Sequence, residues 1–363
     1  MRVVIIGGFI DYQIQLANAL CRKGEEVMLV VPAASAVEHV DNVSPGVILY
    51  TLERHGNLWY HPANLSVVAN LVKHVNSFKP HLIHLQVGGK LDLLIFLFLR
   101  RYPLVAMFHD PKLHLGQPHR HWLNFIMYWA RKRSNQIFVH GQKLKEIMVR
   151  EHDVLAKKVH VIPLGEHQVA PFVKYAKGNL KEDGNLVLFF GSIYRYKGLE
   201  YLIKAEPLIT KEVPNAKIII AGTGEDFDKY EKMMVNRDSF IVHNHYISYR
   251  MGAELFQRCS IVVLPYIDAS QSGVVHPAYG FRKPVVTTNV GSIPEIVDDG
   301  ETGLIVPAKD AKALAEAITR LLKEEKLRTG MGNKAYKKLK TDLSWDPIAE
   351  RTIDVYNRAL GLA

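Results

Sequence analysis

Short apolar runs alternate with longer amphipathic stretches along the whole chain. Because these runs are continuously apolar, they predict strands that are buried on both faces, as in a parallel sheet covered by helices. In the first half, the predicted strands are residues 3–6, 27–31, 47–50, 82–85, 105–109, 136–140 and 159–162. In the second half, they are residues 186–190, 217–221, 241–243, 261–264, 285–287 and 304–306.

The two series of strands predict an α/β protein with two Rossmann-like domains, which agrees with the chain length of 363 residues. We expect the first domain at residues 1–166, a polar linker at 167–185 and the second domain at 186–343. A final helix over 344–363 is expected to pack back on the first domain. Ligands of such sheets bind at the carboxyl ends of the strands, so we expect the site in a cleft between the domains.

The composition is that of a soluble globular protein, with 48% hydrophobic and 23% charged residues. The net charge of +10 favours an anionic partner, such as nucleotide phosphates or an acidic membrane surface. Cys21 and Cys259 lie far apart in apolar contexts and are expected to be free thiols. The chain opens on a strand pattern rather than a signal peptide and has no apolar stretch of about 20 residues. We therefore expect a cytoplasmic protein.

The loop after the strand at 186–190 carries the first candidate chemistry. Gly191 and Ser192 are followed by two cations, Arg195 and Lys197, and a helix is predicted to begin near Gly198. Glycine permits close approach of a ligand to the backbone, while the cations and the helix start favour an anion. The loop fits a diphosphate site at a strand's carboxyl end, although the same residues also fit a solvated basic turn.

A second polar loop follows the strand at 261–264. It contains Ser270, Gln271, Ser272, Gly273 and Val274 and precedes a short apolar helix. Its hydroxyls and backbone N–H groups fit a second anion site, opposite the first. A plain helix cap explains these residues equally well.

Together these segments resemble the family 4 glycosyltransferases, which have the GT-B architecture. The resemblance rests on the 191–198 loop and on a block at 280–303 that contains Lys-Pro-Val-Val, Ile-Pro-Glu and Glu-Thr-Gly. The first half is similar at Gly7-Gly8, 79–84 and 105–110, with less specific motifs. The resemblance implies a retaining sugar transfer from a nucleotide diphosphate sugar to a hydroxyl, usually without a metal.

The resemblance also implies roles for individual residues. Arg195 and Lys197 would neutralise the donor diphosphate. Gly7 and Gly8 would bring the N-terminal loop against the phosphates, and His109 would lie near the sugar and the acceptor.

On the other side of the donor, Ser272 and Gly273 would face the diphosphate. Many relatives carry two glutamates eight positions apart in this region, one near the sugar and one on the ribose. Ala269 and Pro277 occupy those positions here. This departure puts ribose recognition and the sugar-facing carboxylate in doubt and indicates a divergent subgroup or an altered activity.

We expect the nucleotide base near residues 243–247, with His245, Tyr246 and Ile247 among the donor-binding residues. Asp226 and Asp228 form a D-x-D sequence that binds metal in other glycosyltransferases. Here it is interpreted as an acidic helix start, and no metal or cofactor is expected.

A segment at 118–133 bears on partners. From Trp122 to Arg133 it combines two tryptophans, an apolar face and basic ends, which is typical of a helix on an anionic bilayer. A helix packed on the sheet is the alternative. No motif or basic aromatic patch indicates nucleic-acid binding.

These observations predict a glycosyltransferase that acts on a carbohydrate or lipid-linked acceptor or on a surface-glycan precursor. A hexosyl or N-acetylhexosaminyl group is the expected cargo, and His109, Arg195 and Lys197 are the expected catalytic residues. Two alternatives stay open: a nucleotide-sugar epimerase and a non-catalytic module that binds sugar nucleotides.

Overall fold

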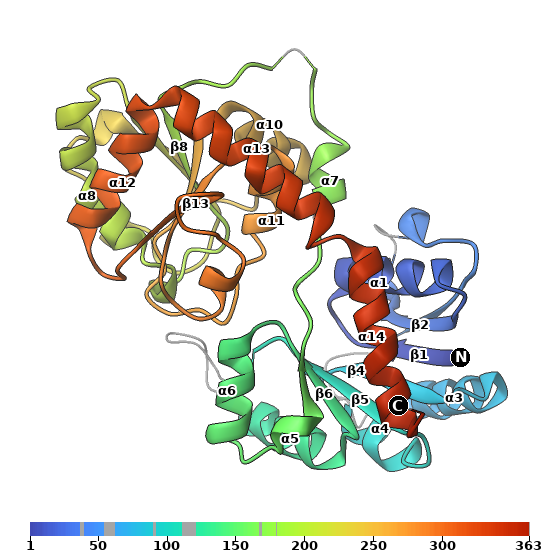
Figure 1. The fold of residues 1–363 in the computed structure, drawn as a ribbon. Helices are drawn as coiled ribbons and strands as arrows, with labels where there is room; N and C mark the ends of the chain where they lie inside the picture. Colours follow the sequence, from blue (N-terminus) through green and yellow to red (C-terminus); the bar gives the residue numbers. More distant parts are fainter. Residues whose placement is uncertain are drawn as a thin grey trace. The chain divides into compact units, whose positions relative to one another are not determined.

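The computed structural model describes residues 1–36, 40–53, 62–89, 92–110, 121–166, 169–178 and 180–362. These residues form two compact units (Figure 1). The first unit takes its described residues from 1–110, 121–165 and the C-terminal segment that begins at Leu343; the second takes them from 166–342. Each unit is built on one parallel sheet, and both are of the Rossmann-like type that GT-B proteins contain.

The sheet of the first unit has the spatial order β3-β2-β1-β4-β5-β6-β7. The strands are β1 (Arg2–Ile6), β2 (Glu26–Pro32), β3 (Val47–Leu52), β4 (Leu82–Gln86), β5 (Leu104–Phe108), β6 (Gln136–Val139) and β7 (Val159–Val161). Each lies where a continuous apolar run predicted it. The strand order reverses between β1 and β4, and the carboxyl ends beside such a reversal are where ligands of these sheets bind.

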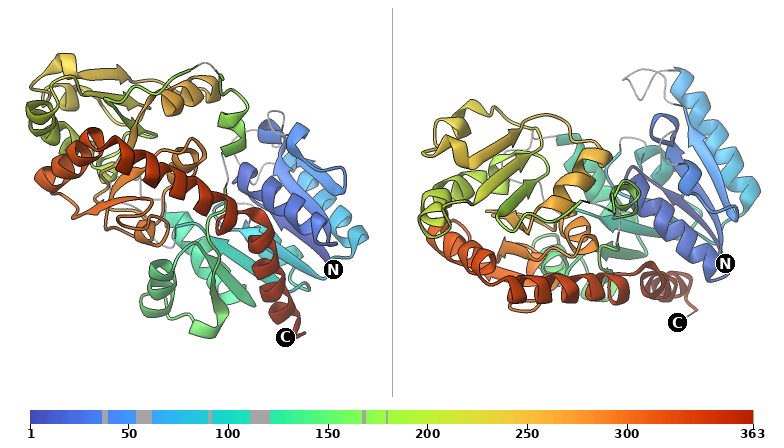
Figure 2. Two further views of the ribbon diagram at one scale, coloured as in Figure 1. Left: turned by 45° about the horizontal axis from the view of Figure 1, so that its top comes forward. Right: turned by 90° about the horizontal axis from the view of Figure 1, so that it is seen from above.

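Helices cover both faces of this sheet. They are α1 (Ile10–Arg22), α2 (Ala33–Ala36), α3 (Pro62–Phe78), α4 (Asp92–Phe98), α5 (His121–Arg133), α6 (Gln142–Arg150) and α14 (Trp345–Leu360). Helix α14 lies beside α1 although more than 300 residues separate them, as Figures 1 and 2 show from three directions. Ile348 and Tyr356 of α14 share a buried core with Leu16 and Leu20 of α1.

The sheet of the second unit has the order β10-β9-β8-β11-β12-β13. Its strands are β8 (Leu186–Phe190), β9 (Lys217–Ala221), β10 (Phe240–His243), β11 (Ile261–Leu264), β12 (Val285–Thr288) and β13 (Gly303–Val306). They again match the predicted runs to within one residue at each end. The order reverses at β8 and β11, so the loops after these two strands border the expected ligand position.

The helices of the second unit are α7 (Val169–Val173), α8 (Leu199–Glu212), α9 (Asp228–Glu231), α10 (Tyr249–Arg258), α11 (Val275–Gly280), α12 (Ala311–Lys323) and α13 (Glu325–Thr341). Helices α8 and α12 lie side by side on one face of the sheet (Figure 1). Between them and the strands lies a core that includes Leu202, Ile220, Val263 and Ile318.

The polar stretch expected as a linker is held to the second unit over most of its described length. Val169 and Phe172 are buried, and a Cβ at Gly252 of α10 would come within 2.3 Å of the Phe172 ring. The side-chain amide of Gln257 also accepts from the Lys177 N–H at 2.9 Å and donates to the Lys177 carbonyl at 2.8 Å. A few apolar residues thus anchor a segment whose overall composition is that of a linker.

Candidate functional site

The loop after β8 is packed against its neighbours, backbone to backbone. Gly191 has φ +113°, and a Cβ at Gly222 would lie 1.8 Å from the Gly191 carbonyl oxygen. At the far end of the loop, Gly198 has φ +66°, and a Cβ there would lie 1.9 Å from the Pro265 carbonyl oxygen. Only glycine fits these contacts, so the loop is held firmly between the ends of β9 and β11.

Lys197 reaches from this loop to the loop after β11. Its Nζ donates to the Tyr266 hydroxyl at 2.8 Å and lies 3.9 Å from the centre of the same ring. The Tyr266 hydroxyl in turn lies 3.1 Å from Ser272 Oγ. The structure thus brings together two of the predicted donor-binding residues, Lys197 and Ser272, through a tyrosine that the sequence analysis did not single out.

Arg195 lies apart from this chain of hydrogen bonds. It is exposed at the start of the 3-10 turn Arg195–Lys197. Burial raises the pKa of the Tyr230 hydroxyl, and the positive charge of Arg195 partly opposes that rise. Arg195 is thus exposed to solvent, whereas Lys197 contacts Tyr266 in the loop after β11.

The predicted loop 270–274 adopts a turn rather than a helix cap. Helix α11 has Val274 at its N-cap and no side-chain cap, and the Ser272 hydroxyl accepts from the Val274 N–H at 3.3 Å. A Cβ on Gly191 would come within 3.6 Å of Val274 Cγ2, so this turn lies directly beside the first glycine of the β8 loop. Gly273 lies between Ser272 and Val274 in this turn, next to the serine that contacts the Tyr266 hydroxyl.

Ser270 and Gln271 of this loop differ in the hydrogen bonds that their oxygen atoms accept. The Ser270 carbonyl accepts from the Ser292 N–H at 2.9 Å. Gln271 Oε1 is buried and has no hydrogen-bond partner within the described residues. Buried acceptors are almost always satisfied, so Gln271 is suited to accept from a ligand or a water.

The positions of the usual glutamates carry no replacement acid. Ala269 is buried, and its carbonyl oxygen would be 1.9 Å from a Cβ on Gly291. Pro277 is buried inside α11. Both positions serve packing here, in keeping with a divergent subgroup.

The residues expected near the base lie at the edge of the sheet. His245, Tyr246 and Ile247 follow β10, the edge strand, and Tyr246 is 77% exposed. The Gly222 N–H donates to the His243 carbonyl at 3.1 Å, which ties the start of this segment to the end of β9. Ser192, by contrast, is exposed at the centre of the sheet, directly after Gly191.

In the first unit, the glycine loop after β1 and His109 come together. Gly7 has φ +154°, and a Cβ there would lie 2.6 Å from Gln86 Cβ. Beyond the exposed Gly8, the ring of Phe9 lies over that of His109, with centroids 3.9 Å apart. His109 is 4% exposed and follows β5 directly, so the predicted strand at 105–109 ends one residue earlier.

A second histidine supports the first, and the sequence analysis missed it. His140 follows β6, and its Nε2 lies 2.9 Å from His109 Nδ1. Tyr12 of α1 packs its ring edge-on against both histidines, with centroid distances of 5.7 Å and 5.4 Å. The signal was present: two neighbouring predicted strands each end in histidine, and parallel strands bring such residues to one edge.

The same edge also carries a buried acid. Asp92 begins α4, and its Oδ2 accepts from the N–H groups of Gly88 at 2.9 Å and Gly89 at 3.1 Å. Burial raises the pKa of the Asp92 carboxyl to about 7, against the lowering effect of those two hydrogen bonds. Asp92 therefore holds the loop after β4 and carries little charge below neutral pH.

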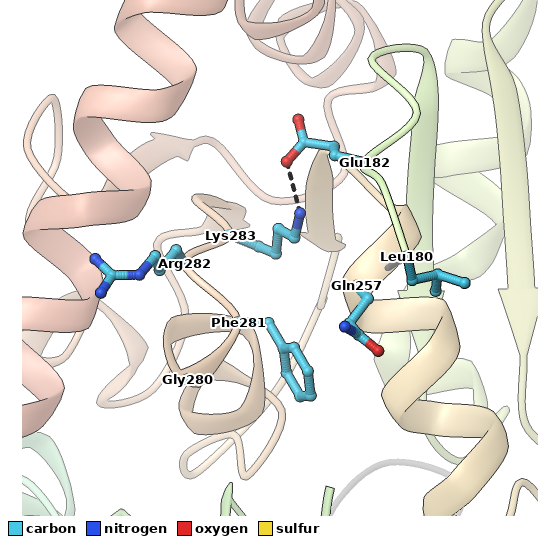
Figure 3. Close-up of a pocket in the computed structure, with 7 residues that line it drawn as sticks. All are labelled: Leu180, Glu182, Gln257, Gly280, Phe281, Arg282 and Lys283. Atoms are coloured by element: carbon cyan, nitrogen blue, oxygen red, sulfur yellow. Dashed lines mark hydrogen bonds and ion pairs between the residues drawn. The ribbon is translucent and has the colours of Figure 1, made fainter. Parts of the chain in front are cut away.

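A pocket of about 350 Å³ lies at the opposite edge of the second sheet (Figure 3). Its residues precede β8, β11 and β12, so it is remote from the loops that follow these strands. Glu182 pairs there with Lys283 at 2.6 Å and with Arg328 at 3.2 Å, and both cations are nearly buried. This pocket surrounds a structural ion-pair network rather than the candidate site.

Among the described residues, no group of three or more histidine, cysteine or acidic side chains is arranged to hold a metal. Asp226 Oδ1 instead accepts from the Asp228 N–H at 3.1 Å, just before α9. Likewise, none of the helices described is both long and apolar enough to span a membrane.

Helix α5 has one packed face and one exposed face. Ile126, Met127 and Ala130 are buried, whereas Phe125 and Trp129 are about half exposed. Residues 118–120 of the segment singled out in the sequence lie outside the described residues. The two interpretations of this segment are therefore compatible, because each concerns a different face.

Comparison with known proteins agrees with these features. Residues 6–165 match the model of glycosyltransferase family 4, and residues 173–338 match that of the group 1 glycosyl transferases. The chain is 25% identical over 98% of its length to an uncharacterized glycosyltransferase of Methanocaldococcus jannaschii, covering 95% of that protein. It is 23% identical over 98% of its length to the phosphatidyl-myo-inositol mannosyltransferase of Mycolicibacterium smegmatis, covering 91% of that protein.

Solved structures share the fold. Sucrose-phosphate synthase from Thermosynechococcus elongatus superposes with a TM-score of 0.76 at 19% identity, over the full length of both chains. HepE from Anabaena, in complex with UDP and glucose, has a TM-score of 0.73 at 16% identity, over 98% of this chain and 99% of its own. The chain belongs to the family 4 glycosyltransferases and has their GT-B fold.

Proposed function

We propose that this glycosyltransferase takes its sugar from a nucleotide diphosphate sugar and transfers it, with retention of anomeric configuration, to a hydroxyl of a carbohydrate or lipid-linked acceptor. The observation that carries the proposal is the Lys197–Tyr266–Ser272 chain at the carboxyl edge of the second sheet. It joins a cation and two hydroxyls where the strand order reverses, which is where phosphates bind in such folds.

In this proposal, Lys197 stabilises the negative charge that develops on the departing diphosphate. The ammonium group is already fixed over the Tyr266 ring, so little reorganisation is needed as the charge forms. Gly191 lets the diphosphate approach the backbone, while Gly198 fixes the end of the loop against Pro265. The N–H groups that begin α8 favour the negative charge of the diphosphate. Ser192, Gly273 and Val274 border the same loops and complete the phosphate environment.

The other predicted residues bind the remaining parts of the donor and the acceptor. Gln271 accepts from the sugar or a bound water, and His245, Tyr246 and Ile247 lie near the base. Arg195 contributes long-range attraction for the phosphates from its exposed position. Gly7 and Gly8 bring the loop after β1 against the donor phosphates, and His109 lies near the sugar and the acceptor. The acceptor hydroxyl attacks the sugar from the same face that the leaving group departs. The chemistry needs no metal, because Lys197 supplies the positive charge.

Relatives support the class of donor and acceptor. HepE from Anabaena is known in complex with UDP and glucose, and the mycobacterial relative is named for mannosyl transfer to phosphatidyl-myo-inositol. A hexose or N-acetylhexosamine donor and an acceptor at a membrane surface fit this pattern.

The test begins with a panel of UDP-, GDP-, dTDP- and ADP-sugars. We expect one donor to raise the melting temperature and to be slowly hydrolysed, and NMR of the released sugar to show the donor's anomeric configuration at first. Inverted product would refute retention. Epimerised donor would support the epimerase alternative, and protection without any turnover would support a non-catalytic binding module.

We further propose that the protein binds the surface of anionic membranes through α4 and α5. These helices are neighbours in the first unit and expose Leu97, Phe98, Phe125, Tyr128 and Trp129. The last turn of α5 is basic, from Arg131 to Arg133, and the whole chain carries +10. Exposed aromatic residues beside cations are typical of helices that lie in the headgroup region.

Sedimentation with phosphatidylglycerol vesicles tests this surface. We expect the double variant Phe125→Ser/Trp129→Ser to lose most of its binding, because the inserted apolar area is removed. The matched control is Leu155→Ser/Val235→Ser, which changes two apolar residues elsewhere that are even more exposed. Equal binding by both variants would remove α5 from the proposal.

A further inference from the structure

Three adjacent strands of the first sheet place their next residues in a row. In the parallel register, Phe108 of β5 is opposite Val139 of β6, which is opposite Val161 of β7. The following residues are therefore His109, His140 and Ile162, side by side at the carboxyl edge. The Ile162 N–H donates to the Val139 carbonyl at 2.9 Å, which continues the ladder and fixes the position of Ile162.

The hydrogen bonds along this row have a defined direction. His140 Nδ1 lies 3.0 Å from the Ile162 carbonyl oxygen, which can only accept, so His140 Nδ1 must carry a proton. His140 is 3% exposed, and burial favours the neutral imidazole. A neutral ring with its proton on Nδ1 has a lone pair on Nε2, and this atom lies 2.9 Å from His109 Nδ1.

The same reasoning determines which nitrogen of His109 carries the proton. Because His140 Nε2 accepts, His109 Nδ1 must donate and carries its own proton. A neutral His109 then has its lone pair on Nε2. Phe9 stacks on one side of His109, and the edge of Tyr12 packs against both imidazoles, so the rings are also held in orientation.

We propose that His140 is a positioning residue that fixes His109 as the tautomer with its proton on Nδ1, so that His109 Nε2 accepts a hydrogen bond from a sugar or acceptor hydroxyl. The tautomer assignment rests only on contacts within the first unit. The role of His109 toward a hydroxyl rests on the proposed sugar transfer. The backbone carbonyl of Ile162 can only accept, so it determines which ring nitrogen carries the proton in His140 and then in His109. The outer hydrogen-bond partner of a metal-bound histidine determines its tautomer in the same way.

Two substitutions separate hydrogen bonding from packing. His140→Leu replaces the imidazole by an apolar side chain of similar size and so removes both hydrogen bonds. His140→Gln keeps an amide that can donate toward the Ile162 carbonyl and accept from His109 Nδ1. The exposed His74→Leu on α3 serves as control.

The direct readout is the two-bond ¹H–¹⁵N spectrum of histidine-labelled protein near pH 7.5, which distinguishes protonated from unprotonated ring nitrogens. We expect His109 to be protonated at Nδ1 alone in the wild-type chain, in His140→Gln and in His74→Leu. In His140→Leu we expect the proton to shift to Nε2 or to be shared between the two nitrogens. A wild-type His109 with its proton on Nε2, or an unchanged His109 in His140→Leu, would overturn the assignment.

Turnover gives the second readout, with the sugar nucleotide from the panel that the wild-type chain consumes fastest. We expect His140→Leu to lower kcat by about ten-fold, in the range of about 10–100-fold known for such outer partners, with little change in KM for the donor. His140→Gln should regain most of the loss. Wild-type kcat in His140→Leu would overturn the functional role. If no donor is consumed, the proposed transfer fails, while the spectrum still decides the tautomer.

Discussion

The carboxyl edges of the two sheets are built from different chemistry. The second unit presents a cation fixed on a tyrosine, serine hydroxyls and glycine-rich backbone. The first unit presents a buried group of rings in which His109 and His140 share a hydrogen bond beneath Phe9 and Tyr12. The second edge is organised around charge, and the first around the direction of hydrogen bonds. This difference suits the roles proposed for the two edges, which are diphosphate binding for the second and orientation of hydroxyl groups for the first.

Removing the fixed cation tests the charged edge most severely. We expect Lys197→Ala to lower turnover by about 10²–10³-fold, the usual cost of losing one preorganised group that stabilises developing charge. Lys204→Ala on α8 is the matched control, since this lysine also lies over a tyrosine ring, at 5.1 Å, but is exposed. Comparable steady-state rates for the two variants would show that the second edge does not act through Lys197.

The tyrosine that links Lys197 to Ser272 should matter less. Tyr266→Phe keeps the ring under Lys197 but removes the hydroxyl that both partners contact. A hydrogen bond to a charged group contributes about 1.5–3 kcal/mol, so we expect a fall in kcat/KM of about ten-fold or somewhat more. An unchanged kcat/KM, with the donor found in the panel, would mean that the ring alone positions the lysine.

Arg195 provides the contrast within the same loop. Because it is exposed, we expect Arg195→Ala to change kcat/KM only a few-fold and to do so less at high salt. Initial rates at 50 mM and 500 mM NaCl test this. A loss as large as that of Lys197→Ala would place both cations on the diphosphate.

At the carboxyl edge of the first sheet, we expect pH to act on the stability of the fold, through the buried carboxyl of Asp92. The pKa of the Asp92 carboxyl is about 7 in the folded chain, against 3.8 for an ordinary aspartate. Between these values the folded state keeps a proton that the unfolded state has lost, so stability falls as pH rises from about 4 to 7 and then levels off.

Asp92→Asn tests this dependence. The amide oxygen of the variant can still accept from Gly88 and Gly89. Because the variant has no carboxyl at this position, we expect its stability to fall less between pH 4 and 7 than that of the wild-type chain. Urea unfolding of this variant and of the exposed control Asp153→Asn, at four pH values, measures the difference. A slope that matches the wild-type chain in both variants would contradict the buried acid.

The strands, their parallel arrangement in two Rossmann-like domains and the loops after β8 and β11 were predictable from the sequence. The apolar runs predict every strand found in the described residues, because burial on both faces leaves a strong local pattern, as in residues 218–221. The glycines at 191 and 198 are visible in the sequence because these positions demand that residue type. Gly191 has a positive φ, and Gly198 packs against the Pro265 carbonyl.

The parts that failed depend on distant partners. Tyr266 lies 69 residues from Lys197, and His140 lies 31 residues from His109, so no local pattern links either pair. The turn at 270–274 looked like a helix cap because serine suits both, and only the contact of Ser272 with Tyr266 distinguishes them. The packing of Phe172 on a helix 80 residues away likewise has no local signal, because the segment at 169–178 has the polar composition of a linker.

Helix α14 has a consequence for how the chain is made. It closes the core of the first unit: Tyr356 bonds to His84 at 2.6 Å, and Trp345 packs on Tyr12. Asp346 and Glu350 pair with Arg22 and Lys23 at 2.6 Å and 2.5 Å. The core of the first unit is therefore complete only when α14 is in place, whereas the second unit takes all its described residues from 166–342. We expect the first unit to expose apolar surface until α14 has been synthesised.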